Sequence, residues 1–323
     1  MIHLFFKYSI GFIFLSTTFL ISACQDSQHS TAGSEEKTEL EVLPAVPAPP
    51  FAYNLNQPDK KTKLPSSLKE VSGLSYIEGG QIAMVQDEVA SIFIFDIDLD
   101  SVVTSHRFGF QGDFEGIEIQ GNKAYVIRSD GMLYEVNNYT EEEPATEKYQ
   151  TPLSPATNPE GLGYLAKEGV FIIAGKEEYL DMEKDEKIDH LRAFYSYDPQ
   201  THQLQTTPLF TVDLNDIKPF ISQYARTENE KEWVSEFDPE KAASFKPSGI
   251  AQHPLTGEIF ITASAGKLLV VLDSTFQFSQ AHYLDRDIFK QPEGICFSPS
   301  GDLYISNEGR NGKGNILWFV YRP

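Results

Sequence analysis

The stretch Glu293-Gly294-Ile295-Cys296-Phe297 is the last of five related segments in this 323-residue chain. Each segment has a polar or acidic residue, a glycine, an aliphatic residue, a variable residue and usually an aromatic or aliphatic residue. Their glycines are 43, 45, 88 and 45 residues apart, so three intervals share one period and one is about twice as long. A period of about 40 to 50 residues with several short strands per unit is typical of propeller repeats. We therefore predict an all-β propeller with one blade per segment. The other four segments are Ser72-Gly73-Leu74-Ser75-Tyr76, Glu115-Gly116-Ile117-Glu118-Ile119, Glu160-Gly161-Leu162-Gly163-Tyr164 and Ser248-Gly249-Ile250-Ala251-Gln252.

The last repeat shows how each blade divides into strands. Alternating side chains and a turn at residues 298–302 indicate strands at 294–297, 303–306 and 316–321. The repeat reaches the end of the sequence with three strands, so its fourth must come from elsewhere. Residues 51–55, with the sequence FAYNL, are the spare strand-like segment before the first repeat. We expect this N-terminal strand to complete the last blade, which closes the ring and removes two sheet edges.

The doubled interval leaves two blade numbers open. The third repeat uses residues up to about 210 for its own four strands, with an acidic insertion at 177–189. Residues 213–244 lack the repeated segment, and 217–224 and 228–237 have a helical or loop-like pattern. We expect a five-bladed propeller with an insertion near 213–244, and a six-bladed propeller is the alternative.

The N-terminal residues indicate export. Lys7 precedes an apolar run at residues 10–20 that is too short to span a bilayer as a resident helix. The run ends in Leu20-Ile21-Ser22-Ala23-Cys24, which resembles the cleavage site of bacterial lipoproteins. This resemblance implies cleavage after Ala23 and lipidation of Cys24, including palmitate, and an ordinary secretory signal peptide is the alternative.

These features define the expected organisation of the chain. Residues 1–23 form the signal peptide, 24–50 a lipidated, Pro-rich, disordered tether, and 51–323 the propeller domain. We expect the protein to be held in the bacterial cell envelope by the lipid on Cys24. Gln25 is not the Asp that retains some lipoproteins at the inner membrane, so we favour the outer membrane or the periplasmic face.

The charge of the chain limits its partners. The formal net charge is −21, from 47 acidic residues and 26 Lys and Arg residues. A chain with this charge repels nucleic acid. Docking on anionic lipid through a cluster of basic residues is also disfavoured, so the possible ligands are cations, cationic groups or neutral molecules. Cys296 has no partner if Cys24 carries lipid, and we expect it to be a buried packing residue. We expect a monomer, and its small-molecule or protein partner is unknown.

The repeated segments also predict a site. The first strand of each propeller blade lines the central channel, and the second strand returns antiparallel to it. The starts of the first strands and the ends of the second strands should therefore meet at one mouth of the channel. Acidic residues at these positions are the candidate metal ligands, and two serines and two further acids are expected beside them. The candidate ligands are Glu115, Glu160, Glu293, Asp87, Glu88 and Glu308, and the neighbours are Ser72, Ser248, Asp130 and Glu177.

This acidic mouth favours a hard cation. Several carboxylates in a narrow site cannot all stay ionised without a countercharge, so either their pKa values rise or a cation binds. Oxygen ligands alone suit Ca²⁺ or Mg²⁺, and Ca²⁺ accepts the looser geometry. The alternative is that each Glu before Gly accepts backbone N–H bonds at the tight entry to its strand.

Four segments in this order and spacing resemble the SdiA-regulated (YjiK-like) propeller family, over about residues 64–321. The resemblance implies a five-bladed propeller, distantly related to NHL-repeat propellers, with bound calcium and no established activity. It makes Glu115, Glu160 and Glu293 the best candidate ligands. The chain departs from the family pattern by Ser72 and Ser248 and by the insertion. The four segments are Glu70-Val71-Ser72-Gly73-Leu74, Asp113-Phe114-Glu115-Gly116-Ile117, Asn158-Pro159-Glu160-Gly161-Leu162 and Gln291-Pro292-Glu293-Gly294-Ile295.

Common catalytic signatures are absent from the sequence. It has no nucleophile elbow, HExxH motif or CxxC pair, and the glycine-rich loop at 309–314 lacks the Lys-Ser/Thr pair of a P-loop. We therefore expect a ligand- or partner-binding module and leave its status as an enzyme uncertain, leaning against catalysis. The alternative is a metal-dependent esterase or phosphoesterase, phytase-like or lactonase-like, in which Asp87, Glu88 or Glu308 acts as base.

Overall fold

The structure is a computed structural model that describes residues 50–181, 184, 186–224, 231–232, 235 and 245–323. The predicted signal peptide, Cys24 and nearly all of the predicted tether lie outside the described residues. No helix in the described part is both long and apolar enough to cross a membrane. Residues 47–323 form one compact unit, and every strand of the blades lies within it.

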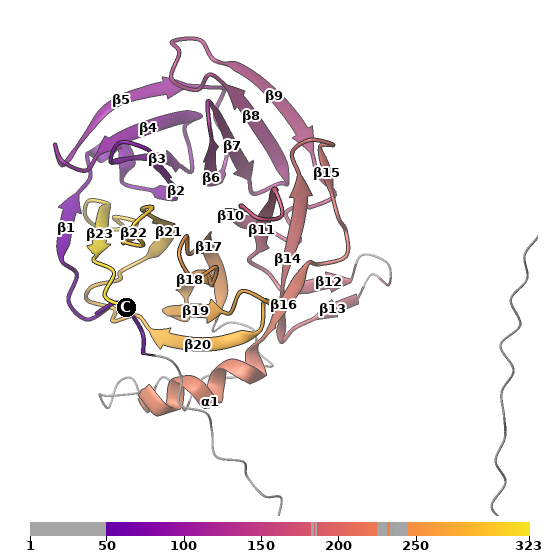
Figure 1. The fold of residues 1–323 in the computed structure, drawn as a ribbon. Coiled ribbons are helices and arrows are strands. Elements are labelled where there is room, and N and C mark those ends of the chain that lie inside the picture. Colours follow the sequence, from indigo (N-terminus) through magenta and orange to yellow (C-terminus); the bar gives the residue numbers. More distant parts are fainter. Residues whose placement is uncertain (1–49, 182–183, 185, 225–230, 233–234, 236–244) are drawn as a thin grey trace, which may run out of the picture. The chain divides into compact units, whose positions relative to one another are not determined.

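Five antiparallel sheets stand around a ring, so the prediction of a five-bladed propeller is confirmed (Figure 1). Blade one contains β2 (Val71–Ile77), β3 (Gln81–Gln86), β4 (Ser91–Asp96) and β5 (Ser101–Arg107). Blade two contains β6 (Phe114–Gln120), β7 (Lys123–Arg128), β8 (Met132–Asn137) and β9 (Ala145–Gln150). Blade four contains β17 (Lys246–Gln252), β18 (Ile259–Ala265), β19 (Leu268–Leu272) and β20 (Phe278–Tyr283).

Blade three occupies most of the long interval between repeats. It contains β10 (Pro159–Leu165), β11 (Val170–Gly175), β14 (Leu191–Asp198), β15 (Gln203–Leu204) and β16 (Phe210–Asp213). The acidic insertion forms a separate hairpin of β12 (Tyr179–Asp181) and β13 (Glu186–Ile188). The helix expected at 217–224 is present as α1 (Leu214–Tyr224), whereas most of 228–237 lies outside the described residues.

Helix α1 covers the outer strand of blade four (Figure 1). The side chain of Asp213 accepts a hydrogen bond from the N–H of Asn215 at 2.8 Å, which caps the start of the helix. Ile217 and Ile221 lie one turn apart and are both buried in the core that blade four contributes to. The insertion is therefore an addition that packs on one blade and does not form a sixth.

Blade five closes the ring, but with a different N-terminal segment from the one predicted. It contains β21 (Pro292–Phe297), β22 (Leu303–Asn307), β23 (Asn315–Phe319) and β1 (Lys60–Lys63), in which β1 pairs antiparallel with β23. The prediction that residues 51–55 form this strand is wrong. An outer strand buries few side chains. In β1 only Thr62 is buried, so the strand shows no apolar alternation in the sequence.

Residues 51–55 owe their apolar alternation to a different contact. Tyr53 and Leu55 are buried in a core cluster that blades four and five share, together with Phe260 and Phe297. The Tyr53 hydroxyl donates to the carbonyl oxygen of Gly301 at 2.6 Å. The segment therefore fills the seam between two blades without joining either sheet.

The repeated glycines lie where the inner strands of neighbouring blades touch. A Cβ atom on Gly116 would stand 2.6 Å from the carbonyl oxygen of Glu160, and one on Gly294 would stand 2.4 Å from that of Ser72. Added Cβ atoms on Gly73, Gly161 and Gly249 would likewise come within about 3.0 Å of the backbone of the next blade. The glycine is therefore required because the blades meet backbone to backbone around the centre of the ring.

Candidate functional site

Each first strand is irregular at the repeated segment. The pairing with the second strand shifts register in all five blades at this point, for example between Pro159 and Leu162 and between Pro292 and Ile295. A β-bulge bends a strand and can aim a side chain away from the regular alternation, and bulges are common beside functional sites. The residue before each glycine therefore lies in a bulge, which the sequence pattern alone did not indicate.

The strand register places the predicted residues at one end of the channel. Pro159 pairs with Gly175, and Pro292 pairs with Asn307, so the start of each first strand lies beside the end of the second. The second strands of blades one, three and five are directly followed by Asp87, Lys176 and Glu308, respectively. The acidic residues of blades one, two, three and five thus lie at the same end of their strands, and blade four has Ser248 at the equivalent position.

Three glutamates of the mouth form a central group with one lysine. The side chain of Glu160 is 2% exposed and that of Glu293 is 9% exposed. Lys176 forms an ion pair with Glu160 through its Nζ atom. Burial, and then the charge of Glu160, raise the pKa values of Glu115 and Glu293 well above the ordinary range for a carboxyl group.

Lys176 compensates only part of this charge. Burial also raises the pKa of Glu160, although Lys176 opposes the rise, and Glu160 in turn raises the pKa of Lys176 against the effect of burial. Three ionised glutamates and one ammonium group would leave two negative charges in a poorly solvated site. The central group therefore holds protons or takes up a further cation. The repeated segments did not indicate Lys176, so its role as countercharge was not predicted from the sequence.

A second acidic group lies on the blade-one side of the mouth. Burial, followed by the charges of Glu70 and Glu308, raises the pKa of Asp87 to about 6. The Oδ1 atom of Asp87 is buried and has no hydrogen-bond partner in the described chain. Burial and Glu70 also raise the pKa of Glu308. Because Glu308 in turn raises the pKa of Glu293, the two acidic groups are electrostatic neighbours.

Other predicted residues have structural partners instead. Asp130 accepts two hydrogen bonds from Arg128, at 2.9 and 2.5 Å, which lower its pKa. Glu177 accepts two from Lys246, at 2.9 and 2.7 Å.

The two serines at the start of first strands also bond to the backbone. The hydroxyl of Ser248 donates to the carbonyl oxygen of Pro292 at 2.9 Å, and that of Ser72 donates to the carbonyl oxygen of Glu70 at 3.3 Å. Glu88, by contrast, is exposed and adds its charge to the surroundings of Asp87.

The candidate ligand atoms at the mouth are of the type that a hard cation prefers. Glu115 and Glu293 form no ion pair among the described residues, and Asp87 offers an unpartnered oxygen. All of these donors are carboxylate oxygens, which Ca²⁺ prefers. In the described part of the chain, however, no three His, Cys, Asp or Glu side chains stand close enough to hold a metal ion. Binding therefore requires the glutamates to draw together from the positions in the structure.

A further carboxyl group with a raised pKa lies on the first strand of blade two, three residues after Glu115. Glu118 occupies the fourth position of its segment and accepts a hydrogen bond from the Ser75 hydroxyl at 2.5 Å. Burial raises the pKa of Glu118 to about 7, and the Ser75 bond partly opposes the rise. Cys296 holds the same segment position in blade five, and it is buried and unpaired, in agreement with a packing role. Burial and Glu118 raise the pKa of its thiol.

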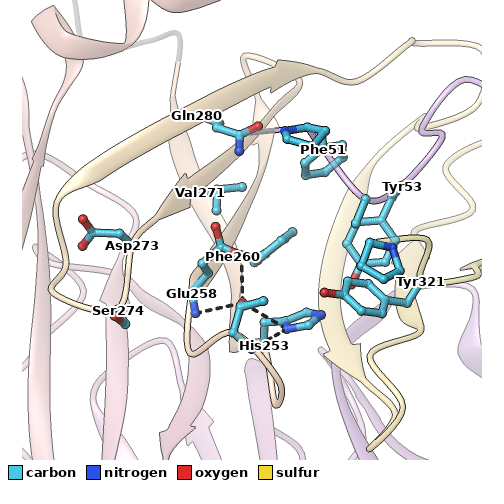
Figure 2. Close-up of a pocket in the computed structure, with 14 residues that line it drawn as sticks. Phe51, Tyr53, His253, Glu258, Phe260, Val271, Asp273, Ser274, Gln280 and Tyr321 are labelled. Carbon is cyan, nitrogen blue, oxygen red and sulfur yellow. Dashed lines mark hydrogen bonds between the residues drawn. The ribbon is translucent and has the colours of Figure 1, made fainter. Parts of the chain in front are cut away.

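A cavity of about 430 Å³ lies at the seam between blades four and five, outside the channel. Figure 2 shows Tyr53, His253, Phe260 and Tyr321 on its walls, with Glu258 and Gln280 among the polar groups. Burial lowers the pKa of His253 to about 4, so the imidazole is neutral near pH 7. The cavity depends on the packing of residues 51–55. It was not predicted from the sequence, because these residues were expected to form a strand.

Several solved structures are similar to this chain in fold. Glutaminyl cyclase from Myxococcus xanthus is similar over 82% of this chain and 96% of that chain, with 10% sequence identity and a TM-score of 0.50. The PQQ-bound aldose sugar dehydrogenase from Streptomyces coelicolor is similar over 81% and 97%, with 11% identity and a TM-score of 0.48. Streptogramin B lyase is similar over 80% and 68%, with 15% identity and a TM-score of 0.41. At these identities the likeness concerns the fold alone.

Neither a scan of protein-family models nor a search of curated protein sequences gives a match to this chain.

Proposed function

We propose that this protein is an exported lipoprotein whose five-bladed propeller binds Ca²⁺ at its channel mouth and acts as a ligand- or partner-binding module. One observation carries the proposal: the buried Glu160 and Glu293 and the half-buried Glu115 have Lys176, which is paired with Glu160, as their common countercharge. A divalent cation would neutralise the charge that Lys176 leaves uncompensated.

The sequence supports the remaining parts of the proposal. The pattern at residues 20–24 supports lipidation of Cys24 and attachment to the bacterial cell envelope. The four segments described above support membership of the SdiA-regulated family, in which calcium is bound. Glu115 and Glu293 are the first candidate ligands, with Asp87, Glu88 and Glu308 beside them. When bound, Ca²⁺ would supply two positive charges that favour the ionised form of these carboxyl groups.

Calcium binding should release protons, which gives a direct test. Because the folded pKa values of Glu115 and Glu293 are raised, these groups carry protons near pH 7 that a metal must displace. We expect calorimetric titration of residues 47–323 with Ca²⁺ at pH 7 to give a heat that depends on the ionisation enthalpy of the buffer. Saturation at about a hundredfold excess over Kd should raise the free energy of unfolding by about 2.7 kcal/mol.

Matched variants identify the site. Glu115→Gln/Glu293→Gln should abolish both the proton release and the calcium-dependent rise in Tm, without lowering the Tm in chelator, because the amides replace carboxyl groups that are already uncharged near pH 7. Asp130→Asn is the control and should bind Ca²⁺ normally, since Asp130 is paired with Arg128. Lys176→Met should strengthen calcium binding by removing a competing cation. The proposal fails if the wild type takes up no Ca²⁺ or if the double variant binds it as well as the wild type does.

Hydrolysis is the second candidate, and Asp87 favours it. A general base works best when its pKa is near the working pH, and Asp87 has a raised pKa of about 6 and an unpartnered oxygen. We expect, under this candidate, calcium-dependent hydrolysis of p-nitrophenyl acetate or p-nitrophenyl phosphate that Asp87→Asn abolishes while calcium binding persists. Wild-type protein with no turnover of either compound above the buffer rate would remove the candidate.

A further inference from the structure

A strongly basic cavity lies on blade five, next to the acidic mouth. It has a volume of about 460 Å³, and five of its lining side chains are cationic. They are Lys61 and Lys63 of β1, Lys290, and Arg310 and Lys313 of the loop between β22 and β23, and Glu308 is the one acid among the lining residues. On a chain with a net charge of −21, this concentration of positive charge is the reverse of the overall balance.

The strand that closes the ring supplies two of the cations. Successive side chains of a strand point to opposite faces, so Lys61 and Lys63 share one face of β1 and Lys60 and Thr62 share the other. Lys61 and Lys63 are exposed, whereas Thr62 is buried and Lys60 pairs with Asp100 at 3.0 Å. The register sets Lys63 opposite Asn315, at the start of β23 and directly after the loop. Ring closure therefore brings the two lysines to the loop.

The loop is fixed at both ends and open at its tip. The N–H of Gly309 donates to the carbonyl oxygen of Lys69 at 2.7 Å, and a Cβ atom on Gly314 would stand 2.4 Å from the carbonyl oxygen of Leu68. Arg310 has a φ of 42°, in the left-handed region, and its Nε donates to Gln291 at 2.5 Å. The backbone N–H groups of Arg310, Asn311 and Lys313 donate to no acceptor in the described chain. Successive free N–H groups in a tight turn are a common anion-binding arrangement.

The cations of the cavity are not neutralised by the protein. Within the described residues, Lys61, Lys63, Lys290 and Lys313 form no ion pair. The nearby Lys267 has its pKa lowered to about 8, by burial and then by the charge of Arg310. The geometry therefore leaves a surplus of positive charge in a concave site with free N–H donors.

We propose that this cavity binds the phosphate group of an anionic ligand. A phosphate monoester carries about two negative charges near pH 7 and several acceptor oxygens, so it matches several lysines and free N–H groups better than a single carboxylate does. The cavity is larger than inorganic phosphate, which leaves room for an attached organic group. The same chemistry occurs in soluble phosphorylated compounds and in phospholipid headgroups. The site is separate from the proposed calcium site, with Glu308 as their common neighbour.

The test compares these two sources on residues 47–323 in the presence of a chelator, so that calcium plays no part. Inorganic phosphate and pyrophosphate are titrated by calorimetry, and co-sedimentation is measured with phosphatidylcholine vesicles with and without phosphatidylglycerol. We expect binding to one of the two sources that weakens steeply with salt. We expect Lys61→Ala/Lys63→Ala/Arg310→Ala to weaken it at least tenfold. Lys60→Ala is the control, because it removes one lysine charge from the opposite face of the same strand, and its binding should stay within twofold of the wild type.

A second measurement does not depend on any variant. Saturating pyrophosphate should protect Lys61, Lys63, Lys290 and Lys313 of the wild type from acetylation, detected by mass spectrometry, while Lys60 remains unprotected. Binding of pyrophosphate identifies a soluble ligand, and binding of phosphatidylglycerol vesicles alone identifies a headgroup. The proposal is overturned if neither probe binds, or if the triple variant and Lys60→Ala lose affinity equally.

Discussion

Single residues in the channel show how burial controls the charge of the site. Glu118 has one short hydrogen bond, from Ser75, and no cation beside it, so burial dominates and its pKa rises to about 7. Asp130 lies at the same mouth as the other acids but has Arg128 as partner, and its pKa falls. The same type of side chain therefore stores a proton or holds a charge according to its nearest neighbour.

The raised pKa of Glu118 predicts a pH dependence of stability. The folded pKa of about 7 exceeds the ordinary value of 4.5, so the folded state binds the proton more tightly than the unfolded state. Its contribution is complete below pH 4.5 and is lost as the pH rises through about 7, by up to about 3 kcal/mol. We expect Glu118→Gln, measured by urea unfolding without calcium, to lose less stability between pH 5 and pH 8 than the wild type. Parallel pH profiles for the two proteins would contradict this account.

At the scale of elements, the repeated segment combines a bulge with a close contact between blades. The bulge takes the side chain before the glycine out of the regular alternation of side chains between the two faces of the strand. The glycine lets the backbone of the next blade come into contact with the strand. One short segment therefore determines both the packing of the inner strands and the position of the acidic groups.

The contact at Gly249 predicts a large effect of one methyl group. A Cβ atom there would stand 2.3 Å from the carbonyl oxygen of Glu293, and this backbone atom of the next blade cannot move aside as a side chain can. We expect Gly249→Ala to lower the free energy of unfolding by about 3 kcal/mol or more, measured by urea denaturation. Gly109→Ala is the control, because its nearest neighbour would be Ala90 at 3.4 Å, and it should change stability by less than about 1 kcal/mol. Equal effects of the two changes would contradict the role of the blade contact.

The elements differ in how far the sequence predicted them. In the last repeat, β21 and β22 lie within two residues of the predicted bounds 294–297 and 303–306, because inner and middle strands bury continuous apolar runs. Blade three, which we expected to use residues up to about 210 for four strands, instead ends in two short strands, β15 and β16, the second of which extends to Asp213. Strand β1 was missed because an outer strand exposed to solvent carries no apolar pattern.

The sites also differ in how far they could be predicted from the sequence. Residue type and repeat position led to Glu115, Glu160 and Glu293, since the repeat places one glutamate before the glycine in three of the five blades. The role of Lys176, the seam cavity and the basic cavity arise from contacts between segments far apart in the chain, such as Lys63 of β1 and the 308–314 loop. No local pattern in the sequence records such contacts.

For the whole molecule, the proposed lipid anchor on Cys24 gives a testable prediction. We expect a chain with Cys24→Ser, expressed in bacteria, to lose incorporation of labelled palmitate and to leave the membrane fraction, because Cys24 is the predicted lipid acceptor. Cys296→Ser is the control and should keep the label, since Cys296 is buried in the propeller. Labelled Cys24→Ser protein would contradict the proposed anchor.

The seam cavity has a consequence for the order of the blades along the chain. Pro50 and Pro323 both line it, so the two ends of the described propeller lie close together. A short linker could join them, and the chain could then be opened in an exposed hairpin such as 78–80, where an added Cβ on Gly79 or Gly80 would meet no atom within 4 Å. Such a circular permutant would keep all five sheets, with β1 and β23 following one another in sequence. The five sheets would then keep their pairing, including that of β1 with β23, although the chain entered the ring at a different blade.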